Sequence, residues 1–191
     1  MNAPALRLSG SEPADALLSS DALALLIGLV LDQQVPMEKA FVGPHVMVER
    51  LGHALDAAEL SAADPDEFAV MFATPPAVHR FPAAMAKRVQ AMCGLLCETY
   101  DGRAENVWAG VTDGATLLRR LKTLPGFGDQ KARITVALLG KQLGVKPTGW
   151  RKAAGEYGEP DVFRSIADIT DEDSLRRVRQ FKQERKAAAR K

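Results

Sequence analysis

The chain has 191 residues, of which 47% are hydrophobic and 26% charged, so it can bury a core and is not disordered as a whole. Its 25 Lys and Arg almost balance its 24 Asp and Glu, and the net charge of +1 excludes a uniformly basic surface. The presence of only two Cys excludes a disulfide scaffold, a four-Cys zinc site and a four-Cys iron–sulfur cluster within the chain.

Ala, Leu, Arg, Glu and Lys dominate the sequence, and no segment shows a sustained alternation of polar and apolar residues. This pattern predicts an all-α fold. The longest apolar run, residues 22–31, is about half as long as a membrane-spanning helix. The first residues lack the basic-then-apolar order of a signal peptide, so we expect a soluble, cytoplasmic protein, associated with the nucleoid if its source is bacterial.

In the N-terminal half, residues 1–15 are predicted to be a frayed arm. Asp21 and the two serines before it are N-cap candidates for a buried helix that ends at Pro36. The next helix is expected from Met37 through Leu51, with a kink or break at Gly43-Pro44. A short helix beginning at Asp64-Pro65 and an amphipathic helix over residues 83–100 follow.

In the C-terminal half, Asp113 is predicted to cap a helix that the sequence TLPGFG interrupts, and a further helix is expected from Gly128 or Asp129 to about Leu143. Residues 145–161 contain three Gly and two Pro and are predicted to form a loop with at most one short helix. A last helix runs from about Asp171 into residues 176–191, which carry eight Lys and Arg against one Glu. This basic tail either adds salt-dependent affinity for a polyanion or only promotes solubility.

The segment Leu124-Pro125-Gly126-Phe127-Gly128 carries the functional argument. Two glycines separated by one apolar residue let the backbone turn tightly and approach a ligand without interference from a Cβ atom. The helix that follows points free N–H groups and the positive end of its dipole at the turn, which favours a phosphate, and Lys131 lies one turn into that helix. The alternative is a helix–turn–helix corner with ordinary glycine turn chemistry.

This hairpin and its surroundings resemble the helix-hairpin-helix/Gly-Pro-Asp superfamily of DNA glycosylases, which act in base-excision repair. LLIGLVLDQQVPMEKA resembles the family's first core helix and the turn after it, HRFPAAMAKRVQAMCGLLCETYDG its middle helix, and LLRRLKTLPGFGDQKARITVALLG its hairpin with both flanking helices. The resemblance covers about residues 18–145. It implies a helical domain over residues 16–175 with two lobes flanking a cleft, the middle lobe being about residues 36–136.

The resemblance further implies double-stranded, damaged DNA as the partner, no organic cofactor and no iron–sulfur cluster, and a monovalent cation held by the hairpin backbone. It assigns DNA contacts to the hairpin and, as a wedge that fills the gap left by an extruded base, to the turn after the first core helix. The residues concerned are Gly126, Phe127, Gly128, Gln130, Lys131, Gln33 and Gln34. The alternative for the two glutamines is that they form only the polar end of a buried helix.

Two departures from the family pattern bear on catalysis. The position of the family's lyase Lys is Gln130, and Lys131, one residue later, points about 100° away, which disfavours a Schiff-base lyase. The position of the family's catalytic Asp falls near Thr148, and no acid occurs between Asp129 and Glu156.

The candidate catalytic acids are therefore Asp161 and Asp129, with Glu156 and Glu159 also nearby. Three outcomes stay open: the loop supplies an acid from another position, the enzyme acts weakly on labile cationic bases, or the protein binds DNA without chemistry.

Each of the remaining candidate residues has both a functional and a purely structural interpretation. Trp150 is a candidate wall of a base pocket, or a core residue. Arg80, Lys87 and Arg88 either contact phosphate or form a solvated helix face. The pair of cysteines, Cys93 and Cys97, is interpreted as small buried apolar residues, and we expect no metal site.

The sequence thus predicts a monofunctional DNA glycosylase that flips a damaged base and hydrolyses its N-glycosidic bond. The first alternative is a non-catalytic DNA-binding protein, specific for a structure or a lesion, that uses the same hairpin. A second alternative is a protein-interaction scaffold with a vestigial hairpin. We expect a monomer that does not associate with membranes.

Overall fold

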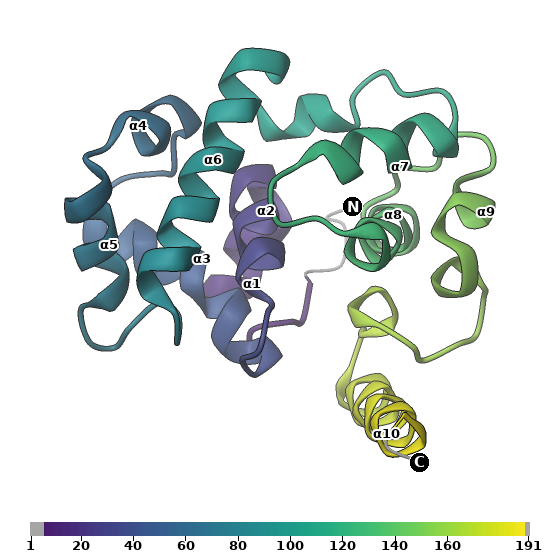
Figure 1. Cartoon of the computed structure of the whole chain (residues 1–191). Coiled ribbons are helices and arrows are strands. Elements are labelled where there is room, and N and C mark those ends of the chain that lie inside the picture. Colours follow the sequence, from purple (N-terminus) through teal and green to yellow (C-terminus); the bar gives the residue numbers. More distant parts are fainter. Residues whose placement is uncertain (1–5, 190–191) are drawn as a thin grey trace. The chain divides into compact units, whose positions relative to one another are not determined.

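The computed structural model describes residues 6–189, and these are all-α (Figure 1). The described part of the chain contains no strand, only an isolated parallel bridge between Asp113 and Thr148. The prediction of an all-α protein is therefore confirmed.

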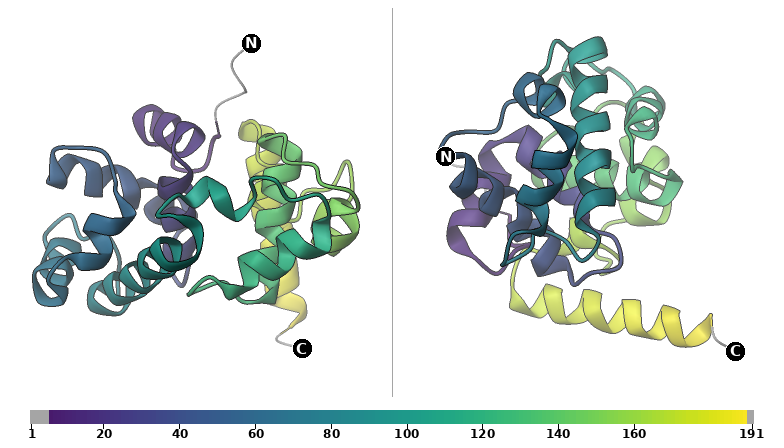
Figure 2. Two further views of the ribbon diagram at one scale, coloured as in Figure 1. Left: turned by 90° about the horizontal axis from the view of Figure 1, so that it is seen from above. Right: turned by 60° about the vertical axis from the view of Figure 1, so that its left-hand side comes forward.

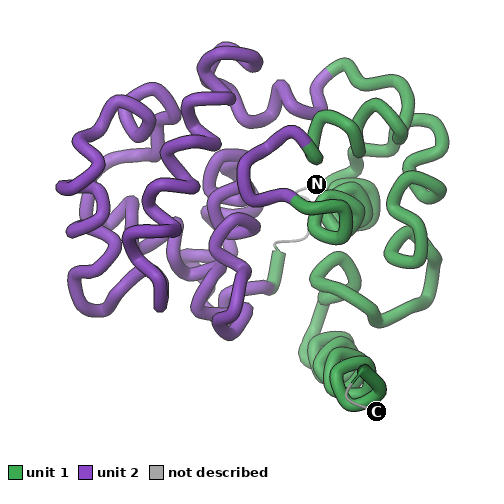
Figure 3. The backbone as a smooth tube through the Cα atoms, in the orientation of Figure 1, with its two compact units in different colours: residues 1–7, 110–122, 128–191 green, residues 8–109, 123–127 purple. Residues whose placement is uncertain are grey.

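The chain divides into two compact units (Figure 3). Unit 2 comprises residues 8–109 and 123–127, and unit 1 comprises, among the described residues, 6–7, 110–122 and 128–189. This grouping differs from the expected middle lobe of residues 36–136. The N-terminal helices belong with the middle helices, whereas the two helices on either side of the hairpin belong with the C-terminal segments.

Unit 2 is built around a buried helix, α2 (Ala22–Leu31). The side chain of Asp21 caps this helix by accepting hydrogen bonds from the backbone N–H groups of Leu23 and Ala24, as expected. Around it lie α1 (Glu12–Ser20), α3 (Met37–Leu51), α4 (Ala57–Ala62), α5 (Pro65–Ala73), α6 (Pro82–Tyr100) and the 3-10 turn η1 (Ala104–Val107). Helices α1 and α3 pack on α2, and α4 and α5 pack on α6.

Helix α3 continues through Gly43-Pro44, so of the expected kink or break, the break does not occur. A Cβ atom on Gly43 would lie 2.5 Å from Leu31 Cδ1, so glycine allows α3 to approach α2 closely. Packing, rather than helix termination, accounts for the glycine at this position.

The prediction of a frayed arm is wrong for residues 6–15, and residues 1–5 lie outside the described part of the chain. Asp15 in α1 is buried, and its Oδ1 accepts hydrogen bonds from the backbone N–H groups of Leu8 and Ser9 at 3.0 and 2.8 Å. The Ser9 hydroxyl donates to the same oxygen. A buried carboxylate satisfied in this way fixes the chain that leads into α1.

Unit 1 is built around α8 (Asp129–Gln142). Helix α9 (Trp150–Ala154) and the 3-10 turns η2 (Gly155–Gly158) and η3 (Ile166–Asp168) pack on α8. The unit also holds nearly all of α7 (Gly114–Thr123), together with α10 (Glu172–Ala188), which Figure 2 shows as one uninterrupted helix. The expected helix from Asp171 into the basic tail is confirmed, and Asp171 caps it.

No helix in residues 6–189 is by itself long and apolar enough to span a membrane. Helices α1 and α2 reach that length only as a pair, and the pair is bent by 116°.

Candidate nucleic-acid interface

The hairpin turn depends on Gly126. Its φ of +89° lies in the region that favours glycine, and a Cβ atom there would lie 2.9 Å from Arg88 Cδ. The backbone N–H of Phe127 closes the turn by donating to the Leu124 carbonyl at 3.0 Å, and both side chains are buried. Conformation and packing therefore both require glycine at position 126.

Gly128 differs from Gly126. It is the N-cap residue of α8 with φ −76° and ψ 176°, an ordinary extended conformation, and a Cβ atom there would meet no atom within 4 Å. The fold does not explain a glycine here, so a positive φ accounts for only one of the two hairpin glycines. Open space beside a long helix's first N–H groups is the geometry that an approaching anion needs.

Two hydrogen bonds to Gln33, from Arg88 and from His79, hold the turn after α2, and we call them the clasp. Gln33 Oε1 accepts a hydrogen bond from Arg88 Nη1 at 2.7 Å, and the Gln33 carbonyl lies 3.0 Å from His79 Nε2. Because His79 Nδ1 accepts from the backbone N–H of Phe81, Nε2 must carry the ring proton and donate to Gln33. His79 is 1% exposed, and its burial lowers its pKa, so the ring is neutral.

Gln34, next in the chain, is exposed and has a left-handed backbone with φ +55°. A non-glycine residue in this region costs about 1–2 kcal/mol and persists only where its surroundings fix it. The clasp on Gln33 supplies that constraint. Its result is an exposed amide side chain on a turn with a defined backbone.

Arg88 connects this turn to the hairpin, within unit 2. Its guanidinium binds Gln33, and its aliphatic stem lies against Gly126. We call residues 33–34, 79–81, 88 and 124–127 the turn–hairpin surface. The sequence pattern allows Arg88 to contact phosphate or solvent, and it gives no signal for His79 or Phe81. The Phe81 side chain is 42% exposed and lies under the Arg80 guanidinium.

Asp129 begins α8 and is engaged by two cations. Its carboxylate oxygens lie 2.9 Å from Lys122 Nζ and 2.7 Å from Arg133 Nε, and these hydrogen bonds hold the pKa of Asp129 below its ordinary value. This carboxylate is 53% exposed, and its negative charge at the N-terminus of α8 interacts favourably with the helix dipole. Lys131 lies half-buried in the same first turn.

A cavity of about 450 Å³ lies beside the start of α8, within unit 1. We call it the α8 cavity. Gln130 Nε2 donates to the Tyr157 hydroxyl at 2.9 Å, and Arg185 Nη1 of α10 lies 3.2 Å from Glu156 Oε1. Its lining residues are Asp129, Gln130, Arg133, Gly155, Glu156, Tyr157 and Arg185. Glu156 therefore shares a cavity with Gln130.

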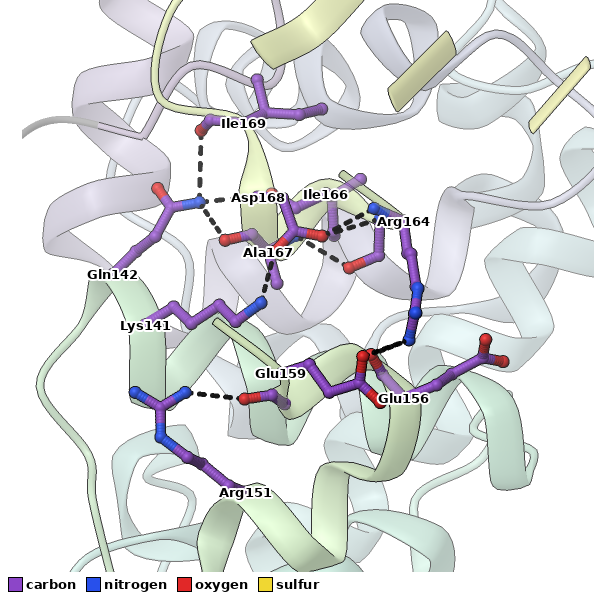
Figure 4. Close-up of polar contacts among 12 residues, drawn as sticks. Lys141, Gln142, Arg151, Glu156, Glu159, Arg164, Ile166, Ala167, Asp168 and Ile169 are labelled. Carbon is purple, nitrogen blue, oxygen red and sulfur yellow. Dashed lines mark hydrogen bonds and ion pairs between the residues drawn. The ribbon is translucent and has the colours of Figure 1, made fainter. Parts of the chain in front are cut away.

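Residues 164–169, which follow Glu156 and Tyr157 in the chain, are held to α8 by partly buried polar contacts (Figure 4). Asp168 is 9% exposed, forms an ion pair with Lys141 and accepts the backbone N–H groups of Arg164 and Ser165. The Gln142 amide donates to the carbonyls of η3 and of the residue after it, and Arg164 donates to the Glu156 carbonyl. These contacts tie η2 and η3 to α8.

Asp161, the other predicted catalytic acid, lies elsewhere in unit 1. It is exposed, has φ +54°, and lines a second cavity of about 330 Å³ together with Phe163 and Phe181. Asp161 and Asp129 do not line the same cavity. Of the acids considered from the sequence, Asp129 and Glu156 line the α8 cavity.

Trp150 is a core residue. It is 8% exposed, and a Cβ atom on Gly140 would lie 2.5 Å from its ring, so the indole packs flat against α8. Trp150 lines neither cavity, and the Arg151 guanidinium lies 4.5 Å from the centre of its ring. Of the two interpretations of Trp150, these contacts favour the core residue.

Thr148, near which the sequence resemblance placed a catalytic Asp, pairs through its backbone with Thr112 and Gly114. The neighbouring Asp113 caps α7 by accepting the backbone N–H of Thr116 at 2.8 Å, and this bond lowers the pKa of Asp113. Sequence analysis identified the cap but not its position beside Thr148.

The cysteines behave as expected from the sequence. Cys93 is buried, which raises the pKa of its thiol to about 12, and Cys97 is half-buried. No group of three or more His, Cys, Asp or Glu side chains within residues 6–189 is arranged to hold a metal ion.

Comparison of the chain with protein-family models, with curated proteins and with solved structures found no match in any of the three.

Proposed function

We propose that this protein binds double-stranded DNA through the turn–hairpin surface and acts in base-excision repair as a monofunctional DNA glycosylase. The observation that carries the proposal is the exposed, left-handed Gln34 beside a clasped Gln33, on the same unit as Gly126 of the hairpin. The proposal also rests on the sequence resemblance over residues 18–145.

The turn has the properties that a wedge requires. A side chain that replaces an extruded base should lose little conformational freedom when it enters the duplex, because unstacking the base already costs free energy. Gln34 lies on a turn whose backbone the clasp holds, and its amide carries a donor and an acceptor for the unpaired partner base.

The hairpin has the properties that a phosphate contact requires. Gly128 leaves open space at the N-terminus of α8, a helix of 14 residues, and Lys131 lies in the first turn. Backbone N–H groups at a helix N-terminus bind phosphate without reading the sequence, so they fix the register of the protein on the duplex. The basic α10 would add salt-dependent affinity.

The second candidate function is lesion-specific DNA binding without chemistry. Asp129 is bound by two cations, and Asp161 lies in a different cavity. One predicted catalytic acid is therefore already bound by cations, and the other lies outside the α8 cavity. Glu156 and Asp129 both line the α8 cavity, but the Asp129 carboxylate is shared by Lys122 and Arg133 at 2.9 and 2.7 Å, whereas Glu156 meets Arg185 at 3.2 Å. We therefore take Glu156 as the candidate catalytic acid.

The experiment that tests the proposal is base release from duplexes with alkylated purines, uracil, hypoxanthine or 8-oxoguanine. Wild type is compared with Glu156→Gln, Asp129→Asn and Asp161→Asn. Release that is lost in Glu156→Gln and kept in Asp161→Asn supports a glycosylase with its acid in the α8 cavity. No release, together with tight and salt-dependent binding to the same duplexes, establishes the second candidate. No binding to any duplex contradicts both.

A further inference from the structure

The side chain of Arg88 contacts two segments, the Gln33-Gln34 turn and the hairpin. Its guanidinium donates to Gln33 Oε1 at 2.7 Å, in the turn that precedes α3. Its Cδ would lie 2.9 Å, and its Cγ 3.4 Å, from a Cβ atom on Gly126 in the hairpin. These segments are more than ninety positions apart in the sequence, and one side chain from α6 contacts both.

We propose that Arg88 is a positioning residue that couples the hairpin to the Gln33-Gln34 turn, so that the backbone at the hairpin and the wedge at the turn hold one another in place. This inference rests on the proposed function for its consequence on DNA, but the coupling itself is a property of the free protein. It replaces both interpretations of Arg88 from the sequence, a phosphate contact and a solvated helix face.

The coupling follows from the number of constraints on each segment. Gln33 is held by its carbonyl through His79 and by its side chain through Arg88. His79 is buried and is itself fixed by the Phe81 N–H, so the carbonyl end of the clasp is rigid. The side-chain end depends on where the Arg88 stem lies, and Gly126 determines that position because it leaves room for the stem.

The strain at Gln34 makes the turn sensitive to that position. A left-handed non-glycine backbone relaxes once its surroundings no longer fix it. Loss of the Arg88–Gln33 hydrogen bond therefore releases Gln34 from its defined conformation. A methyl group at position 126 would also disturb the Arg88–Gln33 hydrogen bond, by displacing the aliphatic stem of Arg88.

The first test uses hydrogen exchange of the full chain in the absence of DNA. Arg88→Met keeps an apolar stem but removes the donor, and Gln33→Leu keeps similar volume but removes the acceptor. Both single variants should raise exchange roughly several-fold in the turn and in the hairpin, and the double variant should match either single variant. Lys87→Met, a neighbouring exposed cation in α6, is the control and should leave both segments unchanged.

Exchange that rises in the turn alone, or effects that add in the double variant, overturns the coupling. A rise in exchange that is equal in all helices would also overturn the coupling, because a general packing role of Arg88 predicts that result. Gly126→Ala is the second route to the same test and should raise exchange at residues 33–34 although it lies in the hairpin.

The second test measures the consequence on DNA. A duplex with 2-aminopurine next to an abasic-site analogue reports unstacking by its fluorescence. Arg88→Met and Gln33→Leu should each lower the preference for this duplex over an intact one by roughly tenfold, with no further loss in the double variant. The slope of affinity against salt should stay that of wild type.

A phosphate contact predicts the opposite pattern. It gives a salt slope reduced by about one and losses that add in the double variant, and that pattern overturns the proposal. If wild type shows no preference for the damaged duplex, the proposed function fails, whereas hydrogen exchange in the free protein still decides whether Arg88 couples the two segments.

Discussion

The turn–hairpin surface and the α8 cavity use polar side chains in different ways. In the former, Gln33 is held through a histidine that is 1% exposed. In the latter, Glu156 and Arg185 meet as an ion pair whose side chains are 43% and 52% exposed. Exposed ion pairs of this kind contribute little to stability and rearrange easily, whereas buried and fully satisfied hydrogen bonds fix geometry.

The difference is consistent with the two tasks that we propose. A wedge must be preorganised, because disorder in the free state would be lost at a cost in binding. A pocket that admits a base must exchange its own contacts for contacts with the ligand. By this argument the polar contacts in unit 2 are the more rigid and those at the cavity rim in unit 1 the more adaptable.

The largest expected effect concerns the buried ion pair that holds η3 to α8. Lys141→Met leaves the carboxylate of Asp168 without its cation, at a position where both side chains are largely buried. We expect a loss of about 3 kcal/mol in the free energy of unfolding, measured by urea denaturation. A loss no larger than that of Lys186→Met, an exposed lysine of α10, would show that the attachment of η3 is not electrostatic.

Gly126→Ala comes next. The substitution places a Cβ atom at φ +89° and against Arg88, so we expect a loss of about 1–3 kcal/mol. Gly94→Ala is the matched control, since Gly94 lies inside α6 with open space around it and alanine favours a helix. Equal stability of the two alanine variants would contradict the packing described for the hairpin.

The clasp also predicts a pH dependence. Burial lowers the pKa of His79 from 6.5, so its folded-state pKa lies below its unfolded value. Stability from this group is complete above the unfolded pKa and is lost as the pH falls through 6.5 toward the lower folded value. Denaturation midpoints over this window should fall in wild type and in His53→Gln, an exposed histidine, but fall less in His79→Gln.

The smallest effect on stability is expected at the cavity rim. Glu156→Gln and Arg185→Ala should leave the denaturation midpoint unchanged, because the ion pair is exposed. Glu156→Gln should nonetheless abolish base release if the protein is a glycosylase. A large loss of stability in either variant would remove the contrast between a rigid surface and an adaptable rim.

Local chemistry made most helices predictable. The cap at Asp21, the apolar stripe of α6 and the glycines of the hairpin are signals that lie within a few residues of the structure they specify. Helix α4 was missed because its six residues carry little pattern. The N-terminal segment was misjudged because it is anchored by one buried carboxylate, Asp15, which composition does not reveal.

The candidate site was harder to predict, because it depends on contacts between distant segments. The hairpin and the two glutamines were identified, but neither Arg88 as their link nor His79 as their support follows from spacing. The sequence left Trp150 open between a pocket wall and a core residue because tryptophan suits both stacking and packing, and its contact with Gly140 favours the core. Tyr157 and Arg185 enter the α8 cavity from different elements, so no local motif joins them.

The most direct test of the central claim is the affinity of the full chain for a duplex with an abasic-site analogue and for the matched intact duplex, in wild type and Gln34→Ala, over a range of salt. We expect wild type to prefer the damaged duplex by roughly tenfold or more, and Gln34→Ala to lose this preference while its salt slope stays the same. Equal preference in the two proteins would show that the turn does not recognise damage and would contradict the proposed role of the turn–hairpin surface.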